Sequence, residues 1–348
     1  MESVKSAGLL LVLASMLPMA VRAHHAVGAF FDTSVPMTIN GVVTSMQWQN
    51  PHVLLTIESD SDGAGPQRWR VESGGPTLLR RLGVTADIAA VGDRVSLSGY
   101  PSRVDPREMI GVRIELADGR SLPMFPTLAA RFGLQPQYGV HITEEAAEAD
   151  SRSARGIFRV WTYGRTSDRP VVEPAYTPQA LAGQARYDPL VDDPALRCIA
   201  AGMPLVMDNP FPIEFTDRGE EILLALELWD IQRTIHMTDV STDMDTDAGA
   251  GSAHRGTPLG YSVGQWEGNT LEVTTTDIDW AIFDDAGTPQ GRQVQSVERF
   301  TLSDDERRLE YEVLITDPET LLEPLVLRWH WDWVPGESLQ AYGCTLVE

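Results

Sequence analysis

The 348-residue sequence predicts an all-β protein with two domains. Residues 37–119 alternate apolar and polar side chains in short runs, and the same alternation returns from residue 213 to residue 343. Turn-forming residues separate the runs in both regions. A stretch rich in Ala, Glu and Arg lies between the regions and has no apolar face, so we expect the domains to be joined there.

The first domain, residues 24–122, is expected to be a small barrel of the OB type. Three strands are followed by Gly74-Gly75-Pro76, a short helix at Thr77–Leu82 and two further strands. That order of elements is the order of an OB-like barrel. The expected strands are Met37–Gln49, Val53–Ile57, Arg68–Glu72, Val95–Gly99 and Ile110–Leu116.

Residues 123–155 are expected to link the two domains. Within them, Glu144–Arg155 fits either a solvated helix or a flexible linker, because it is rich in charged residues and alanine.

The second domain, residues 156–348, is expected to be a lipocalin-like up-and-down antiparallel barrel. Residues 170–212 contain many prolines and should wrap a surface. Consecutive strands joined by hairpin turns favour a barrel wide enough to hold one small ligand. The expected strands are Ile213–Phe215, Ile222–Leu228, Gln232–Met237, Gly260–Gln265, Thr270–Thr276, Gln293–Leu302, Arg308–Thr316, Leu325–Val334 and Leu339–Gly343.

Residues 1–23 have the pattern of a secretory signal peptide. Lys5 precedes an apolar run from Ala7 to Ala20, and Val21-Arg22-Ala23 supplies small residues at the two positions that a signal peptidase reads. The run is shorter than the roughly 20 residues of a membrane-spanning helix. We therefore expect a periplasmic or secreted protein whose mature chain begins at His24.

The charge of the chain limits its partners. There are 50 acidic residues against 27 basic ones, which gives a formal net charge of −23. Such a protein repels nucleic-acid phosphates and anionic membrane surfaces. The expected partner is a small molecule, without nucleic acid or stable membrane insertion, and the oligomeric state stays open.

Two cysteines, Cys198 and Cys344, are present. An even number of cysteines in an exported protein favours a disulfide bond. Such a bond would join the beginning of the second domain to its last expected strand.

Several motifs resemble an uncharacterised secreted bacterial family that carries only a domain-of-unknown-function label. In the first domain they are Ala23-His24-His25, Trp48-Gln49-Asn50-Pro51-His52 and Gly74-Gly75-Pro76-Thr77-Leu78. In the second domain they include Asp193-Pro194 with Cys198, Gly202-Met203-Pro204 and Gly260-Tyr261-Ser262-Val263-Gly264-Gln265-Trp266-Glu267-Gly268-Asn269-Thr270-Leu271. The resemblance implies secretion and an all-β fold, and it implies no particular activity.

The leading hypothesis for function is that the C-terminal barrel binds, and in one version transforms, a small apolar or cyclic molecule. In the last long strand, Trp329 and Trp331 share one face while His330 lies on the other, and either face is compatible with the interior. An interior lined by tryptophan would stack against a ring. The candidate ligand-binding residues are Arg233, Tyr261, Trp266, Arg299, Trp329, Trp331 and Tyr342.

An alternative is a lyase, isomerase or hydrolase that needs no organic cofactor. His236, His330 and Asp317 are its candidate catalytic residues, because imidazole and carboxylate groups serve as general acids and bases near neutral pH.

A second alternative is periplasmic metal binding. A mature N-terminal His24 would offer an α-amino nitrogen and a ring nitrogen, and His25 or His52 would complete a nitrogen-rich site. Such ligands suit copper or another divalent metal.

Two motif matches lack the context that their chemistry needs. The G-x-S-x-G run at Gly260–Gly264 leads into a hairpin turn, whereas a nucleophile elbow leads into a helix. Asp243–Asp247 resembles the beginning of a calcium loop, but Ala248 and His254 stand where glycine and glutamate are required.

Overall fold

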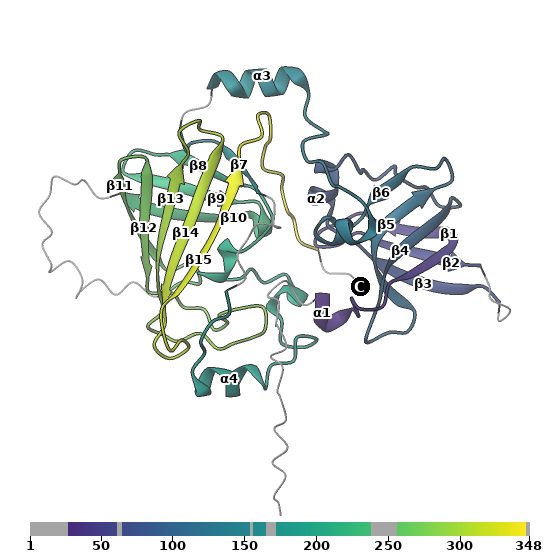
Figure 1. The fold of residues 1–348 in the computed structure, drawn as a ribbon, viewed down its shortest axis with the longest axis horizontal. Helices are drawn as coiled ribbons and strands as arrows, with labels where there is room; N and C mark the ends of the chain where they lie inside the picture. Colours follow the sequence, from purple (N-terminus) through teal and green to yellow (C-terminus); the bar gives the residue numbers. More distant parts are fainter. Residues whose placement is uncertain (1–26, 61–64, 154–155, 165–171, 238–255, 346–348) are drawn as a thin grey trace, which may run out of the picture.

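The computed structural model describes residues 27–60, 65–153, 156–164, 172–237 and 256–345. Two barrels lie side by side, with helix α3 across one end and the segment after the last strand running between them (Figure 1). The prediction of an all-β protein with a small barrel followed by a larger one is confirmed. The expected signal peptide lies outside the described residues.

The small barrel has OB topology. Its sheet has the order β3-β2-β1-β4-β5-β6, and a parallel pairing of β3 with β5 closes the ring. The long strand β1 makes this possible, because one part of it pairs with β2 and another part pairs with β4. The strands are β1 (Met37–Gln47), β2 (Leu54–Ser59), β3 (Gln67–Glu72), β4 (Arg94–Pro101), β5 (Glu108–Leu116) and β6 (Ser121–Pro123).

The large barrel is a closed ring of nine strands in the order β10-β11-β12-β13-β14-β15-β7-β8-β9. An up-and-down ring with an odd number of strands needs one parallel pair, and here that pair is β10–β11. The strands are β7 (Val160–Tyr163), β8 (Ile213–Asp217), β9 (Glu221–Leu226), β10 (Ile231–Met237), β11 (Tyr261–Glu267), β12 (Thr270–Thr276), β13 (Gln295–Leu302), β14 (Arg308–Thr316) and β15 (Leu325–Asp332).

One expected strand is wrong. Residues Leu339–Gly343 are not a strand of the barrel but an extended segment that contacts the small barrel. The ring is closed instead by β7, which the sequence pattern did not reveal. This strand has four residues and pairs with β15 through only Tyr163 and Thr162, so it carries little periodicity.

Helices are few and short. The described helices are α1 (Val27–Phe30), α2 (Pro76–Arg81), α3 (Glu144–Ser153), α4 (Pro178–Gln184) and the 3₁₀ turns η1 (Pro126–Phe132), η3 (Pro194–Arg197), η4 (Leu205–Met207) and η5 (Leu228–Asp230). Glu144–Arg155 was expected to be either a solvated helix or a flexible linker, and the structure has a helix, α3, over most of it. Asp150 on α3 accepts hydrogen bonds from the indole of Trp333 and the backbone of Gly336. Within the described ranges, no helix has the length and apolar character needed to cross a bilayer.

Side chains fill the lumen of the large barrel. Strands β8 and β13 lie on opposite sides of the ring, yet the ring centroids of Phe215 and Phe300 are 5.2 Å apart. Trp331 on β15 stacks on Phe300 at 6.3 Å and is fully buried. Around these three residues the interior of the barrel is therefore a packed aromatic core.

The disulfide between Cys198 and Cys344 is present, with a Cα–Cα distance of 5.9 Å and a sequence separation of 146. Cys344 belongs to the extended C-terminal segment, so the bond fastens that segment to the proline-rich part of the second domain. By the chain-entropy model, closing a loop of this length stabilises the fold by about 4–5 kcal/mol.

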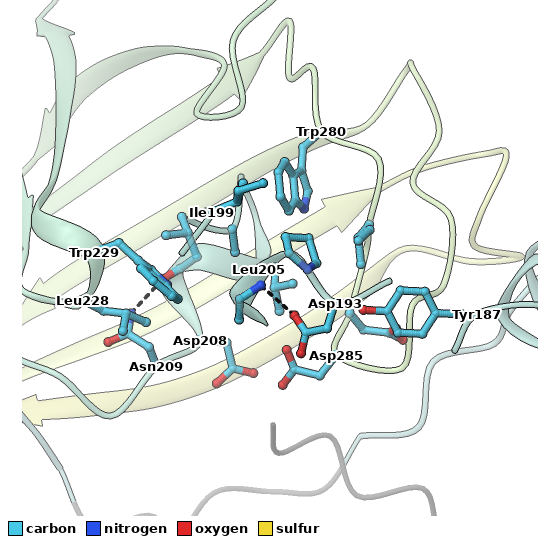
Figure 2. A pocket seen from close by; sticks show the side chains of 16 residues that line it. Tyr187, Asp193, Ile199, Leu205, Asp208, Asn209, Leu228, Trp229, Trp280 and Asp285 are labelled. Atoms are coloured by element: carbon cyan, nitrogen blue, oxygen red, sulfur yellow. Dashed lines mark hydrogen bonds between the residues drawn. The ribbon is translucent and has the colours of Figure 1, made fainter. Parts of the chain in front are cut away.

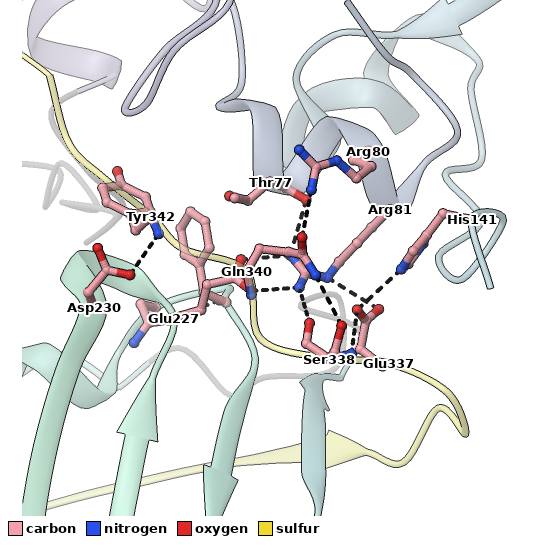
Figure 3. Close-up of polar contacts among 12 residues, drawn as sticks. Thr77, Arg80, Arg81, His141, Glu227, Asp230, Glu337, Ser338, Gln340 and Tyr342 are labelled. Atoms are coloured by element: carbon pink, nitrogen blue, oxygen red, sulfur yellow. Dashed lines mark hydrogen bonds and ion pairs between the residues drawn. The ribbon is translucent and has the colours of Figure 1, made fainter. Parts of the chain in front are cut away.

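A buried arginine joins the two barrels. Arg81 on α2 is 1% exposed and forms a bidentate ion pair with Glu227 of the second barrel, with distances of 2.7 and 2.6 Å (Figure 3). Its Nε lies 3.2 Å from Glu337 in the C-terminal segment, and Nη2 donates to the carbonyl of Ser338. Burial lowers the pKa of Arg81, but the two carboxylates outweigh burial and raise the pKa above its usual value.

Replacing Arg81 by methionine should destabilise the protein strongly. Arg81→Met leaves the buried carboxylate of Glu227 without its cation and Glu337 with only the imidazole of His141 beside it. Breaking comparable buried pairs costs about 3–5 kcal/mol. Arg94→Met is the matched control, because its ion pair with Asp60 is exposed and contributes about 0–1 kcal/mol. The free energy of unfolding in urea measures both effects, and equal losses in the two variants would contradict the buried ion pair.

Candidate functional site

A pocket lies at one end of the large barrel (Figure 2). Three segments meet there: the proline-rich segment before β8, the turn between β9 and β10, and the loop between β12 and β13. Its volume is about 580 Å³, counting the space open to solvent. The lining residues are Tyr187, Asp193, Pro194, Ala195, Ile199, Ala201, Leu205, Val206, Asp208, Asn209, Leu228, Trp229, Trp280, Ile282, Asp284 and Asp285.

Two glycines seat two of the aromatic rings of the pocket. A Cβ atom on Gly202 would lie 2.6 Å from the indole of Trp280, so only glycine lets this ring pack against the backbone. A Cβ atom on Gly287 would lie 2.0 Å from the ring of Tyr187, and the φ of +74° at Gly287 also favours glycine. Both rings are therefore held by close backbone contact rather than by flexible side chains.

The third ring belongs to a turn with unusual backbone. Trp229 and Asp230 both have positive φ, at 64° and 54°, which non-glycine residues rarely adopt. The carboxylate of Asp230 accepts hydrogen bonds from the backbone N–H groups of Tyr342 and Gly343 at 2.7 and 2.9 Å. Trp229 also packs on Tyr342, with ring centroids 5.2 Å apart. The C-terminal segment thus holds this wall of the pocket.

Several carboxylates lie close enough to Tyr187, one of the lining residues, to influence its hydroxyl group. Burial raises the pKa of Tyr187 well above its usual value, and the negative charges of Asp193, Asp192 and Asp285 raise it further. Asp193 accepts a hydrogen bond from the backbone N–H of Ala195 at 2.9 Å. The Tyr187 side chain therefore stays a neutral phenol in a region of negative potential.

A second polar cluster lies inside the barrel lumen. Arg233 on β10 is 2% exposed and pairs with the fully buried Glu298 on β13 through both of its terminal nitrogens. Arg233 also donates to Ser262 at 3.0 Å and to Thr275 at 2.7 Å, and the hydroxyl of Tyr311 donates to Glu298 at 2.9 Å. The arginine and the glutamate satisfy each other, so this cluster is part of the packed interior.

The structure separates the sequence-predicted ligand-binding residues. Arg233, Trp329 and Trp331 point into the filled lumen. Among the others, Tyr261 and Arg299 lie on the outer surface, and Tyr261 is stacked on His236. Trp266 lies on the inward face of β11, paired with Leu271 at the barrel end away from the pocket. Tyr342 is buried behind Trp229, between the pocket and the small barrel. None of these seven residues is among those that line the pocket.

The three candidate catalytic residues do not come together. His236 lies on the outer face of β10, 3.1 Å from Glu221, and β7, β8 and β9 separate β10 from β15, which carries His330. Asp317 follows β14 at the pocket end of the barrel, whereas His330 pairs with Glu310, seven positions away, or roughly 20 Å along the strand.

Asp317 has a structural role. Its carboxylate accepts hydrogen bonds from the backbone N–H groups of Gly291 at 2.8 Å and of Glu319 at 3.2 Å. These contacts fasten the loop between β12 and β13 to the loop between β14 and β15. They leave the carboxylate 2% exposed.

The candidate metal ligands are not assembled in the described part of the chain. His24 and His25 lie outside the described residues, and so does the calcium-like run at Asp243–Asp247. His52 is half-exposed and contacts the carbonyl of Ser73 at 3.0 Å. Across the ranges that the structure describes, no group of three or more His, Cys, Asp or Glu side chains is placed to hold a metal ion.

Sequence reasoning missed the residues of the pocket. They lie in loops, where no hydrophobic period marks them. A signal was nevertheless present, because Asp193-Pro194, Cys198 and Gly202-Met203-Pro204 stood out as motifs of the second domain. Asp193 and Pro194 line the pocket, and Gly202 seats Trp280.

Removing the charge of Glu298 should destabilise the large barrel. Glu298→Gln leaves the guanidinium of Arg233 buried without a counter-ion, and we expect a loss of about 3–5 kcal/mol in the free energy of unfolding. Glu312→Gln on the neighbouring strand is the control, because its partner Arg328 is 63% exposed and the expected loss is about 0–1 kcal/mol. Urea titration followed by tryptophan fluorescence compares them, and a small loss for Glu298→Gln would show that the lumen admits water to Arg233.

A comparison with known protein families gives a partial match. The model of a family of unknown function, DUF6152, matches residues 12–110, which is less than half of the chain. The match covers most of the small barrel and ends within β5. No curated protein matches the sequence. The first barrel is thus similar to an uncharacterised domain family, and the match does not extend to the pocket.

Proposed function

We propose that this protein is exported to the periplasm or secreted, and that it binds a small cyclic molecule in the pocket at the end of its large barrel. The observation that carries the proposal is the set of three aromatic side chains, Tyr187, Trp229 and Trp280, which line one cavity together with aliphatic residues. Aromatic rings supply large, rigid contact surfaces for other rings. The mouth of a β-barrel is also a common place for a ligand.

The position of the site differs from the expectation that the lumen holds the ligand. The lumen is filled by Phe215, Phe300 and Trp331 and by the pair Arg233–Glu298. The barrel instead provides a rigid base, and the loops at its end provide the contacts. Loops fixed on a rigid scaffold often carry binding sites.

Binding, rather than chemical turnover, is the function that the geometry supports. His236, His330 and Asp317 lie at three separate places, so no acid–base pair among them faces the pocket. Asp284 lines the pocket but accepts hydrogen bonds from Tyr176 at 2.5 Å and from Thr288 at 2.8 Å, which hold its loop. The metal-binding alternative stays a prediction, since His24 and His25 lie outside the described residues.

The pocket can be tested with a panel of small cyclic compounds, neutral and charged, screened by saturation-transfer NMR on the mature protein. We expect at least one class to bind, and Trp280→Leu to weaken that binding roughly tenfold because it removes one aromatic wall. Trp266→Leu is the matched control, since Trp266 is 39% exposed and lies at the end of the barrel away from the pocket. Equal binding by the two variants, or no binding by any class, would contradict the proposal.

Export has its own test. N-terminal sequencing of protein made with its natural leader should give His24 as the first residue. A chain that keeps residues 1–23 in the final product would contradict export through a cleaved signal.

A further inference from the structure

We propose that the ligand of this pocket is a small cyclic organic cation, such as an arylammonium compound. This inference rests on the proposed function and names the class of molecule that the same pocket takes. It is based on the negative charges of the lining residues, on the neutral hydrogen-bond donors that hold these carboxylates, and on the aromatic rings beside them.

The lining is one-sided in charge. Of the sixteen lining side chains four are carboxylates, Asp193, Asp208, Asp284 and Asp285, and none of the sixteen is basic. Figure 2 shows Asp193, Asp208 and Asp285 grouped on one side of Trp280, with Tyr187 beyond them. An anionic ligand placed there would meet like charges at short range, which disfavours binding.

Two of these carboxylates are held by neutral donors. Asp193 accepts from the backbone of Ala195, and Asp284 accepts from Tyr176 and from the side chain and backbone of Thr288. Hydrogen bonds from neutral groups stabilise a carboxylate in its charged form and do not cancel its charge. A cation in the pocket would therefore meet negative charge that is already fixed in place.

The aromatic rings add a second attraction. Ring faces carry a negative quadrupole, so tryptophan and tyrosine faces attract ammonium groups, and the attraction strengthens when the cation loses water. Trp229 and Trp280 line the pocket together with Tyr187, whose hydroxyl stays protonated in this field. Carboxylates next to the faces of aromatic rings are suited to bind an ammonium group that is attached to a ring or cage.

The whole molecule favours the same sign of ligand. With a formal net charge of −23, the protein attracts cations from a distance and repels anions. Long-range attraction of this kind weakens as salt screens it, whereas stacking of a neutral ring does not. Salt dependence therefore separates the two kinds of ligand.

The test compares two probes of the same shape by isothermal titration calorimetry on the mature protein. The probes are para-hydroxyphenyltrimethylammonium and para-tert-butylphenol. They have the same shape, but the first has a positively charged nitrogen where the second has a neutral carbon. We expect the cation to bind at least roughly tenfold more tightly than the neutral compound, and its affinity to fall with added salt. Para-tert-butylbenzoate, the anionic probe, should bind most weakly.

Asp193→Asn is the variant that isolates charge. Asparagine can still accept the hydrogen bond from Ala195, so the local turn should persist while one negative charge is lost. We expect severalfold weaker binding of the cation and unchanged binding of the phenol. Glu323→Gln removes one exposed carboxylate elsewhere on the second domain and should change neither.

The outcomes are distinct. Tight binding of the cation that weakens in Asp193→Asn but not in Glu323→Gln supports the inference. Equal or tighter binding of the phenol or the benzoate overturns the charge assignment and leaves a cyclic ligand in the pocket. If none of the three probes binds, and the compound panel also gives no ligand, the inference and the proposed function both fail.

Discussion

The arrangement of the molecule depends on one buried ion pair network between the two barrels. A guanidinium group with 1% exposure needs a counter-ion, and Arg81 finds Glu227 in one barrel and Glu337 in the segment that ends the chain. Removing Arg81 would leave the buried carboxylate of Glu227 without its counter-ion, and Glu337 would keep only the imidazole of His141, 3.3 Å away. The network therefore fixes the position of α2 against the turn after β9, which also carries one wall of the pocket.

The C-terminal segment connects the small barrel to the walls of the pocket. Its Tyr342 carbonyl accepts a hydrogen bond from Asn50 of the small barrel at 2.5 Å, while its backbone N–H groups donate to Asp230. The adjacent Cys344 is bonded to Cys198, close to Pro194 and Ile199 in the pocket lining. One short segment thus contacts the small barrel and two walls of the pocket, which links the first domain structurally to the pocket of the second.

Patterns of local sequence predicted the architecture well but did not point to the candidate pocket. Alternation located β12 and β14 to the residue, and turn signals gave the hairpins, because each strand carries its own period of two. Strand β7 and the path of Leu339–Gly343 depend on distant partners, which local patterns do not contain. Alternation alone did not decide which face of β15 points into the barrel, and the packing in the structure places Trp329 and Trp331 inside. The pocket joins three loops far apart in sequence, so only its glycine and proline motifs were visible.

The most direct test of the pocket is a crystal structure of the protein with para-hydroxyphenyltrimethylammonium bound. A site at the barrel end predicts density for the ring and its ammonium group in contact with Trp229 and Trp280, near Asp193. The C-terminal segment should keep its contacts to Asp230. Density in the lumen beside Arg233, or on the outer surface beside His236 and Tyr261, would contradict a binding site in this pocket.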